Sequence, residues 1–196
     1  MSIHIYKDVE LTEQVSEGDM TNPDTETLDG SAGEFKDREL FIANEQTTLA
    51  EAIDAVTSDI VLAAPRFMDG EVIIIGTEEM RVLSGGGTTQ VTVQRAVYGT
   101  QPAAHAQGTK VFSACNYSEL SVEPVDTSGT DESSWCTLAL TQEGLDAATP
   151  GQALSLGDKS YNSTISFFRR LSVPAGTGID KKTDLKIRLT GSMSLV

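Results

Sequence analysis

Apolar and polar residues alternate in short runs along much of this chain. The clearest runs are residues 3–6, 90–94 and 185–189, and the last alternates apolar with basic side chains. A period of two puts successive side chains on opposite faces of a strand, so one face is buried and the other is wet. Clusters of Gly, Asp, Asn, Thr and Pro separate the runs, as in residues 16–39. The pattern therefore predicts an all-β protein.

Three further segments support this prediction. Residues 72–75 are short and β-branched, which is typical of a central strand. The glycines of residues 84–88 predict a hairpin tip, and this segment lacks the lysine and the following helix of a phosphate-binding loop. Residues 164–173 indicate a long strand that ends at Pro174, because proline cannot donate to a ladder.

The predicted strands divide into an outer part and an inserted part. Residues 1–46 hold too few apolar positions to form a core alone, and the strand-rich residues 114–196 can complete one. Between them, residues 47–113 predict a small inserted β domain, because loop insertions cost little chain entropy. Strand spacing, long turns and a single tryptophan, Trp135, which we expect to be buried, predict an immunoglobulin-like β-sandwich for the outer part.

The charge of the chain limits its partners. A formal net charge of −15 argues against sequence-independent binding to DNA or RNA, which depends on neutralising phosphates with Lys and Arg. Residues 1–158 carry 27 acidic and 7 basic residues, whereas residues 159–196 carry 2 acidic and 7 basic residues. Head-to-tail contact between copies is one interpretation of this polarity, and solvated strand faces are the other. No apolar run is long enough to span a bilayer, so we expect no membrane association.

Five side chains in the basic stretch are candidates for subunit contacts: Phe168, Arg169, Arg170, Lys181 and Lys182. Phe167 and Phe168 are adjacent on one predicted strand, so their rings point to opposite faces. We expect Phe167 in the core and Phe168 toward a neighbouring subunit.

Groups suited to catalysis or metal binding are few. The histidines are His4 and His105, and neither has a nucleophile or further metal ligands at suitable spacing. Glu78 and Glu79 are adjacent, so a strand directs them to opposite faces and they cannot act as a pair. We therefore expect no catalytic residue, no cofactor and no metal.

The two cysteines, Cys115 and Cys136, are too few for a disulfide framework or a metal site. A hairpin between residues 117–123 and 135–140 would place them on different rungs of its ladder. We therefore expect two buried free thiols.

The most specific motif of the chain follows the strand that leads to Gly76 and Glu78. After a hairpin comes the spacing R-x-x-x-G-T-x-x-x-x-H-x-x-G-T, which is matched at Arg95, Gly99, Thr100, His105, Gly108 and Thr109. This third of the chain closely resembles a small β module that recurs in structural proteins of tailed bacteriophages and related viruses. The resemblance implies a building part of a virion rather than an enzyme.

The resemblance also implies roles within the module. His105 is similar to a structural histidine that caps a turn through its ring nitrogens. Glu78 would bond to turn amides or to the Arg95 guanidinium. We expect an Arg95–Glu78 pair across neighbouring strands to fix their register.

Residues 47–57 fit two structures. Leu49, Ile53 and Val56 would share one face of a helix capped by a preceding threonine, which local propensity favours. The resembled module favours a strand that pairs with the apolar run of residues 59–62. We expect the strand.

The outer part is also similar to phage virion proteins. These share an opening I-Y-K-D…N-P-D-x…D-G-x-x-G-E and an ending V-P…K-T-D-L-x-I-R-L-x-G. The two patterns occur here at residues 5–8, 22–24, 29–34, 173–174 and 182–191.

These resemblances imply a structural component of a tailed virus particle, located in the virion at the tail, neck or baseplate. Such a protein would act as a homo-oligomer in contact with other virion proteins, because many weak contacts in a ring give a stable assembly. The alternative is a virion-surface decoration or a receptor- or glycan-binding adhesion module, which would need a concave patch with convergent polar and aromatic groups.

Overall fold

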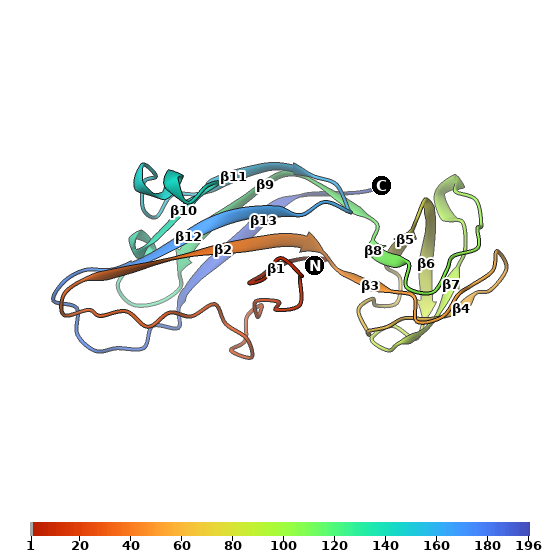
Figure 1. Cartoon of the computed structure of the whole chain (residues 1–196), viewed down its shortest axis with the longest axis horizontal. Helices are drawn as coiled ribbons and strands as arrows, with labels where there is room; N and C mark the ends of the chain where they lie inside the picture. The colour runs from red at the N-terminus through yellow and green to blue at the C-terminus, as the bar shows by residue number, and fades with distance from the viewer. Residues whose placement is uncertain (1) are drawn as a thin grey trace.

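The computed structural model describes residues 2–196, and its regular structure is almost entirely β (Figure 1). Strands make up 45% of the chain and helices 5%. The strands form three sheets of four, three and six strands, and neighbouring strands are antiparallel throughout. The all-β prediction is confirmed.

Two of the sheets pack face to face and form the elongated lobe on the left of Figure 1, called here the two-sheet lobe. The four-stranded sheet has the order β1 (Ile3–Tyr6), β2 (Glu34–Asn44), β12 (Ile165–Val173) and β10 (Cys136–Ala139). The three-stranded sheet has the order β11 (Leu154–Lys159), β9 (Cys115–Asp126) and β13 (Leu185–Leu195). Leu40, Ile42 and Phe167 of the first sheet share one buried core with Leu120 and Val122 of the second.

Three of the predicted strands are confirmed in this lobe, and the run at residues 3–6 is β1. The strand expected at residues 164–173 is β12, which pairs with β2 from Ile165 opposite Ile42 to Val173 opposite Glu34. The run at residues 185–189 begins β13, which continues to Leu195. In that run the apolar residues are half-buried and the basic ones exposed, as their alternation predicts.

The six-stranded sheet forms the compact lobe on the right of Figure 1, called here the curled lobe. Its order is β3 (Gln46–Thr48), β8 (Lys110–Ser113), β5 (Val72–Ile75), β6 (Glu78–Ser84), β7 (Gln90–Gln94) and β4 (Asp59–Val61). The sheet curls so far that Leu49, just after β3, forms a bridge with Leu62, just after β4. Its concave side therefore encloses a separate core, which includes Phe67, Ile73 and Val82.

Residues 47–57 do not form a helix. After β3 the chain stays extended enough for isolated bridges at Leu49 and Ile53. The expected pairing with the run at residues 59–62 forms only as the bridge between Leu49 and Leu62. The ladder partner of β3 is β8, and β4, which begins that run, pairs with β7. Leu49 and Ile53 are buried in the core of the curled lobe, so packing of the whole lobe decides the structure here over local helix propensity.

One expectation for the two-sheet lobe was wrong, and one pairing that we considered does not form. Trp135 is half-buried in a short 3₁₀ helix, and the strand begins only at Cys136. The hairpin considered between residues 117–123 and 135–140 does not form, because β9 is already paired on both edges, by β11 and β13, and β10 lies in the other sheet. Both thiols are nevertheless buried and free, as predicted.

Helical structure in residues 2–196 consists of three 3₁₀ segments, η1 (Val97–Gly99), η2 (Ser133–Trp135) and η3 (Glu143–Asp146). The longest has four residues. No helix in this described part of the chain is long and apolar enough to cross a membrane.

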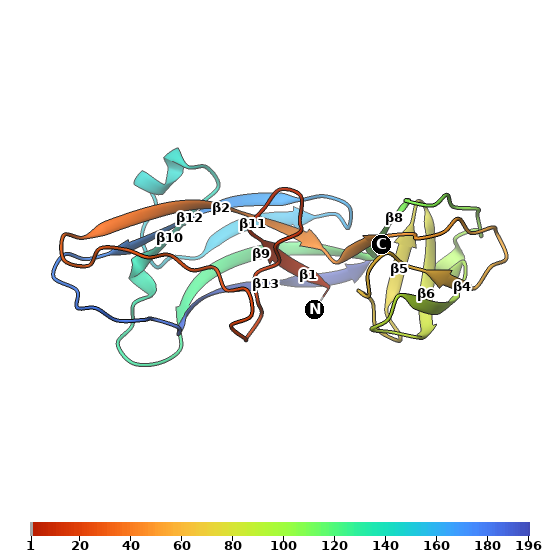
Figure 2. The same cartoon turned by 60° about the horizontal axis from the view of Figure 1, so that its bottom comes forward.

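The chain passes between the two lobes twice, from β2 to β3 and from β8 to β9 (Figures 1 and 2). The lobes also touch through side chains. The rings of Phe112 and Tyr161 meet edge to face, 5.7 Å apart, beside the buried residues Val72, Ile74 and Ala114.

Candidate functional site

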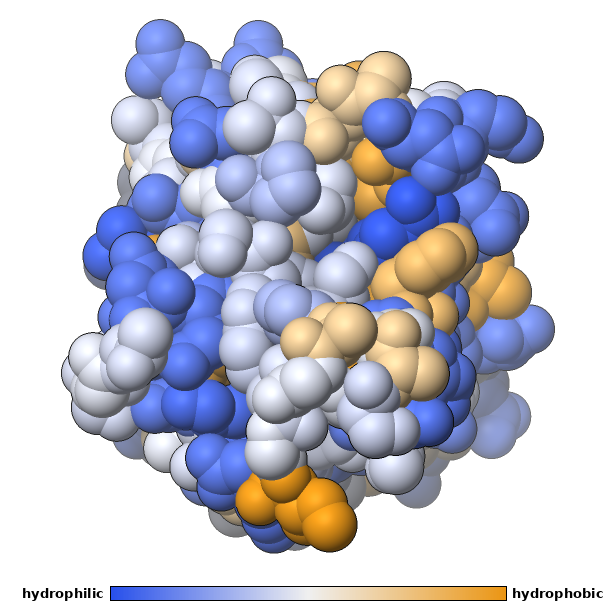
Figure 3. All heavy atoms as spheres, turned by 90° about the vertical axis from the view of Figure 1, so that its left-hand side faces the viewer, coloured by the Kyte–Doolittle hydropathy of each residue, from blue (hydrophilic) through white to orange (hydrophobic). Residues whose placement is uncertain are grey.

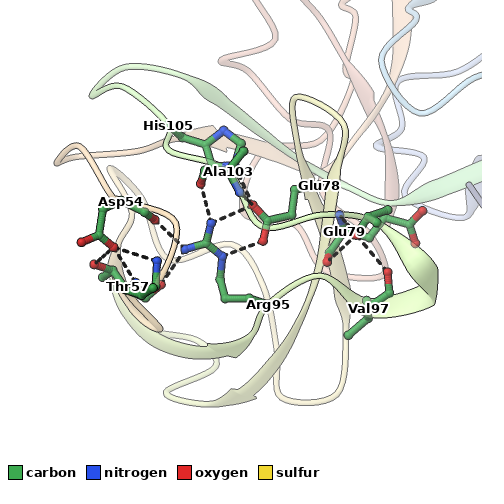
Figure 4. Close-up of polar contacts among 10 residues, drawn as sticks. Asp54, Thr57, Glu78, Glu79, Arg95, Val97, Ala103 and His105 are labelled. Atoms are coloured by element: carbon green, nitrogen blue, oxygen red, sulfur yellow. Dashed lines mark hydrogen bonds and ion pairs between the residues drawn. The ribbon is translucent and has the colours of Figure 1, made fainter.

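The densest polar cluster of the curled lobe is built around Glu78, the first residue of β6 (Figure 4). A two-residue turn joins β5 to β6, so Glu78 pairs with Ile75. Gly76 in this turn has a φ of +64°, and a Cβ there would lie 3.7 Å from the His105 ring. The turn therefore needs glycine for its left-handed conformation.

Arg95 reaches Glu78 from the segment just after β7 and uses all five of its N–H groups. Nε and Nη2 donate to the two carboxylate oxygens of Glu78, each at 2.7 Å. Nη1 donates to the carbonyls of Asp54 and Thr57 at 2.8 and 2.7 Å, and Nη2 also donates to Ala103 O at 2.6 Å. The guanidinium thus connects β6 to two loop segments, one with Asp54 and Thr57 and one with Ala103.

The Glu78 side chain is fully buried and acts only as an acceptor. Besides Arg95, its Oε2 accepts from the backbone N–H of Ala103 at 3.0 Å and from Nε2 of His105 at 2.9 Å. Burial opposes ionisation, but the hydrogen bonds from Arg95, His105 and Ala103 outweigh it and lower the pKa of Glu78 to about 2. Glu78 is therefore a carboxylate at neutral pH.

His105 is held by its backbone as well as its ring. Its N–H and C=O exchange hydrogen bonds of 2.9 Å with the C=O and N–H of Ile53. Because a carboxylate only accepts, the ring nitrogen facing Glu78 carries the proton. The resemblance implied a histidine that caps a turn, and here its ring and the Ala103 amide bond the same carboxylate oxygen.

The remaining residues of the motif also hold backbone. Gly99 and Gly108 have φ values of +88° and +81°, which favour glycine. Thr100 Oγ1 donates to Val97 O at 2.9 Å, and Thr109 Oγ1 donates to Ala106 O at 2.7 Å. The motif therefore specifies the loops of the curled lobe.

This cluster leaves little scope for chemistry. Arg95 has no N–H left for a substrate anion, and the side chains of Arg95 and His105 are each only 9% exposed. The neighbouring acid, Glu79, points to the opposite side of β6 (Figure 4). Burial raises its pKa there, and its Oε2 has no hydrogen-bond partner among residues 2–196. Within residues 2–196 there is no group of three or more His, Cys, Asp or Glu side chains that could hold a metal ion.

The basic candidates of the C-terminal stretch are mostly engaged within the chain. Arg169 is 1% exposed and bonds Asp24 and Glu26. Its partners come from the loop before β2, so this arginine lies inside the two-sheet lobe and is not accessible to a neighbouring subunit. The surface at the far end of that lobe is mainly hydrophilic, with small separate apolar patches (Figure 3).

The other four candidates lie nearer the surface. Arg170 forms ion pairs with Asp37 and Asp146, and Lys182 donates to Glu132 at 2.9 Å. Lys181 is exposed and Phe168 is half-buried. Four of the seven basic side chains of residues 159–196, namely Arg169, Arg170, Lys182 and Arg188, are thus paired with acids of the same chain, which weakens the head-to-tail charge interpretation.

Sequence reasoning missed one buried polar pair, Asn44 and Lys159. Lys159 is 2% exposed at the end of β11, and Asn44 is 1% exposed at the end of β2. Neither residue belongs to a motif that the sequence analysis identified. The one available signal was a lone lysine ending an alternating run, which is normally a solvated strand end.

No family model, no curated protein and no solved structure matches this chain.

Proposed function

We propose that this protein is a structural component of a tailed virus particle, in the tail, neck or baseplate, and that it acts through oligomeric protein–protein contacts. The observation that carries the proposal is how the motif residues of the curled lobe are used. Their polar groups bond to the chain's own backbone or to Glu78, as seen for Arg95, Thr100, His105 and Thr109. A motif that shapes a rigid module, with no reactive group left free, suits a building part.

The outer face of the four-stranded sheet supplies a contact surface for such a part. Phe168 and Arg170 alternate with buried residues on β12, so they project from the face that is turned away from the core. Phe35 on β2 lies opposite Ser172 and is 57% exposed, with the Arg170 guanidinium 4.2 Å above its ring. Aromatic and arginine side chains are the residues enriched at protein interfaces. We place the subunit contact on this face.

Native mass spectrometry of the purified chain tests the proposal. We expect a defined ring or other closed oligomer, and we expect the double variant Phe35→Ser, Phe168→Ser to shift it to monomer. Val56→Ser is the matched control, because Val56 is 83% exposed in the other lobe and should leave the oligomer unchanged. A strict monomer at high concentration would count against the structural role.

The same purified protein also distinguishes the structural role from the alternative function. A receptor- or glycan-binding module would remain monomeric or small and would bind on a glycan array or to cells. Binding there, combined with a monomeric mass, would favour the adhesion module over the structural component.

We further propose that the two-sheet lobe is an immunoglobulin-like sandwich. Two antiparallel sheets that share one core support this, whereas the half-buried Trp135 departs from the pattern. An experimental structure tests it: the strands of the lobe should superpose in space and in chain order on immunoglobulin domains, and a different strand order would refute it.

A further inference from the structure

The Asn44–Lys159 pair brings an amine and a carboxamide together in a place shielded from water. Lys159 Nζ donates to Asn44 Oδ1 at 2.6 Å, and the two residues are 115 positions apart in the chain. Within residues 2–196 the only other hydrogen-bond partner of Nζ is the carbonyl of Ser160, at 3.0 Å. The amine therefore lies in hydrogen-bond contact with the carbonyl oxygen of the Asn44 amide.

The Asn44 amide is held in a fixed orientation. Its Nδ2 donates to Ser113 O at 3.1 Å and to Cys115 O at 2.7 Å, which uses both of its N–H groups. This assignment also leaves Oδ1, and not Nδ2, facing the lysine. Both ends of the amide are thus fixed by the return of the chain from β8 to β9.

The lysine has no counter-ion. None of the ion pairs formed by residues 2–196 includes Lys159. Burial without a carboxylate disfavours the ammonium form and lowers the pKa of Lys159 to about 8. A desolvated lysine with a lowered pKa is an activated nucleophile, because its neutral amine is populated near physiological pH.

We propose that Lys159 and Asn44 form an intramolecular isopeptide bond. The neutral Nζ attacks Asn44 Cγ, the Nζ–Cγ bond forms, and the Cγ–Nδ2 bond breaks. One proton passes from Nζ to the departing nitrogen, which leaves as ammonia. Atoms and electrons balance without an oxidant or a co-reactant.

The fixed contact between the Lys159 amine and the Asn44 amide accelerates this reaction. Reacting groups fixed in contact reach effective molarities of about 10⁵–10⁸ M, which compensates for the low reactivity of a carboxamide. Tyr117 lies directly opposite Lys159 on the β9–β11 ladder, so its side chain is on the same face. Its hydroxyl is buried with no hydrogen-bond partner within residues 2–196, and burial raises its pKa, so it stays protonated.

The bond would tie the two sheets together. Asn44 ends β2 in the four-stranded sheet, and Lys159 ends β11 in the three-stranded sheet, beside both connections to the curled lobe. A cross-link that closes so long a loop removes conformational freedom from the unfolded chain and so stabilises the folded one.

Intact-protein mass spectrometry tests the proposal on the full chain. After incubation at about pH 9, above the lowered pKa of Lys159, we expect a mass lower by one ammonia. Proteolysis should then yield one linked pair of peptides that contains Asn44 and Lys159. Lys159→Met should keep the full mass, and Lys186→Met should lose ammonia as the wild type does.

Two outcomes would overturn the proposal. An unchanged wild-type mass after prolonged incubation means that no bond forms. Loss of ammonia that persists in folded Lys159→Met means that another asparagine is responsible. If Lys159→Met does not fold, the wild-type peptide map decides alone, because linked peptides must join these two residues.

Discussion

Arg95 and Glu78 join through two parallel hydrogen bonds of 2.7 Å, from Nε and Nη2 to the two carboxylate oxygens. The side chains are 9% and 0% exposed, so neither charge can turn to water if its partner is removed. A buried charge without its partner is far more costly than an exposed one. The pair therefore makes the curled lobe dependent on both residues.

Replacing either partner should destabilise the protein strongly. We expect Glu78→Gln or Arg95→Met to lower the free energy of unfolding by about 3–5 kcal/mol, measured by urea denaturation. The matched control is Glu123→Gln, which breaks the exposed pair with Arg188 and should change stability little. The charge-swapped double variant Glu78→Arg, Arg95→Glu tests the pairing itself: if it regains none of the stability lost by the single variants, the pair does not fix the register.

Acid should remove the contribution of Glu78 to the stability of the fold over a defined pH range. Its pKa is about 2 in the folded protein against an ordinary value of 4.5. A lowered folded pKa gives stability that is complete above the unfolded pKa and lost as the pH falls through the folded one. The stability difference between wild type and Glu78→Gln should therefore be constant above about pH 4.5 and shrink toward pH 2. A difference that does not change across this window would contradict the assigned pKa.

How far the sequence predicts this arrangement differs between elements. Alternation and turn residues are local signals, and they predicted β12, the start of β13 and the hairpin after β6. The contact of Arg95 with Glu78 was also anticipated, because a spaced motif fixes both residues within one small module. These features depend on short stretches of chain.

Features that depend on distant partners were not predictable. Alternation predicted that Arg169 lies on a strand, but it did not show which face of that strand is covered. Its partner Asp24 is 145 positions away in the chain. Asn44 and Lys159 likewise meet only when the two sheets pack. The prediction for Trp135 was wrong for a related reason, because the strand in this apolar run begins only at Cys136. A periodic pattern assigns a face to a residue, and the tertiary fold assigns its neighbour.

Glu79 should behave in the opposite way to Glu78. Burial raises its pKa, and no partner compensates its Oε2. For an acid with a raised folded pKa, protonation favours the folded state, so this contribution is present at low pH and lost as the pH rises through the folded value. We expect Glu79→Gln to be more stable than wild type at neutral pH in thermal unfolding, and the gain to vanish in acid. Glu51→Gln, at an exposed position, is the control and should show no gain.

The two thiols should be inert in the folded protein. Cys115 and Cys136 are 6% and 1% exposed within one core, and burial raises the pKa of Cys136 to about 12. Since the thiolate is the reactive form, a disulfide-exchange reagent such as Ellman's reagent should label neither residue in native buffer and both in denaturant. Cys136→Ser should retain one reactive thiol in denaturant and should be less stable, because a hydroxyl replaces a thiol in an apolar core. Rapid labelling of Cys136 in native buffer would show that β10 separates from the core of the two-sheet lobe, contrary to the packing described above.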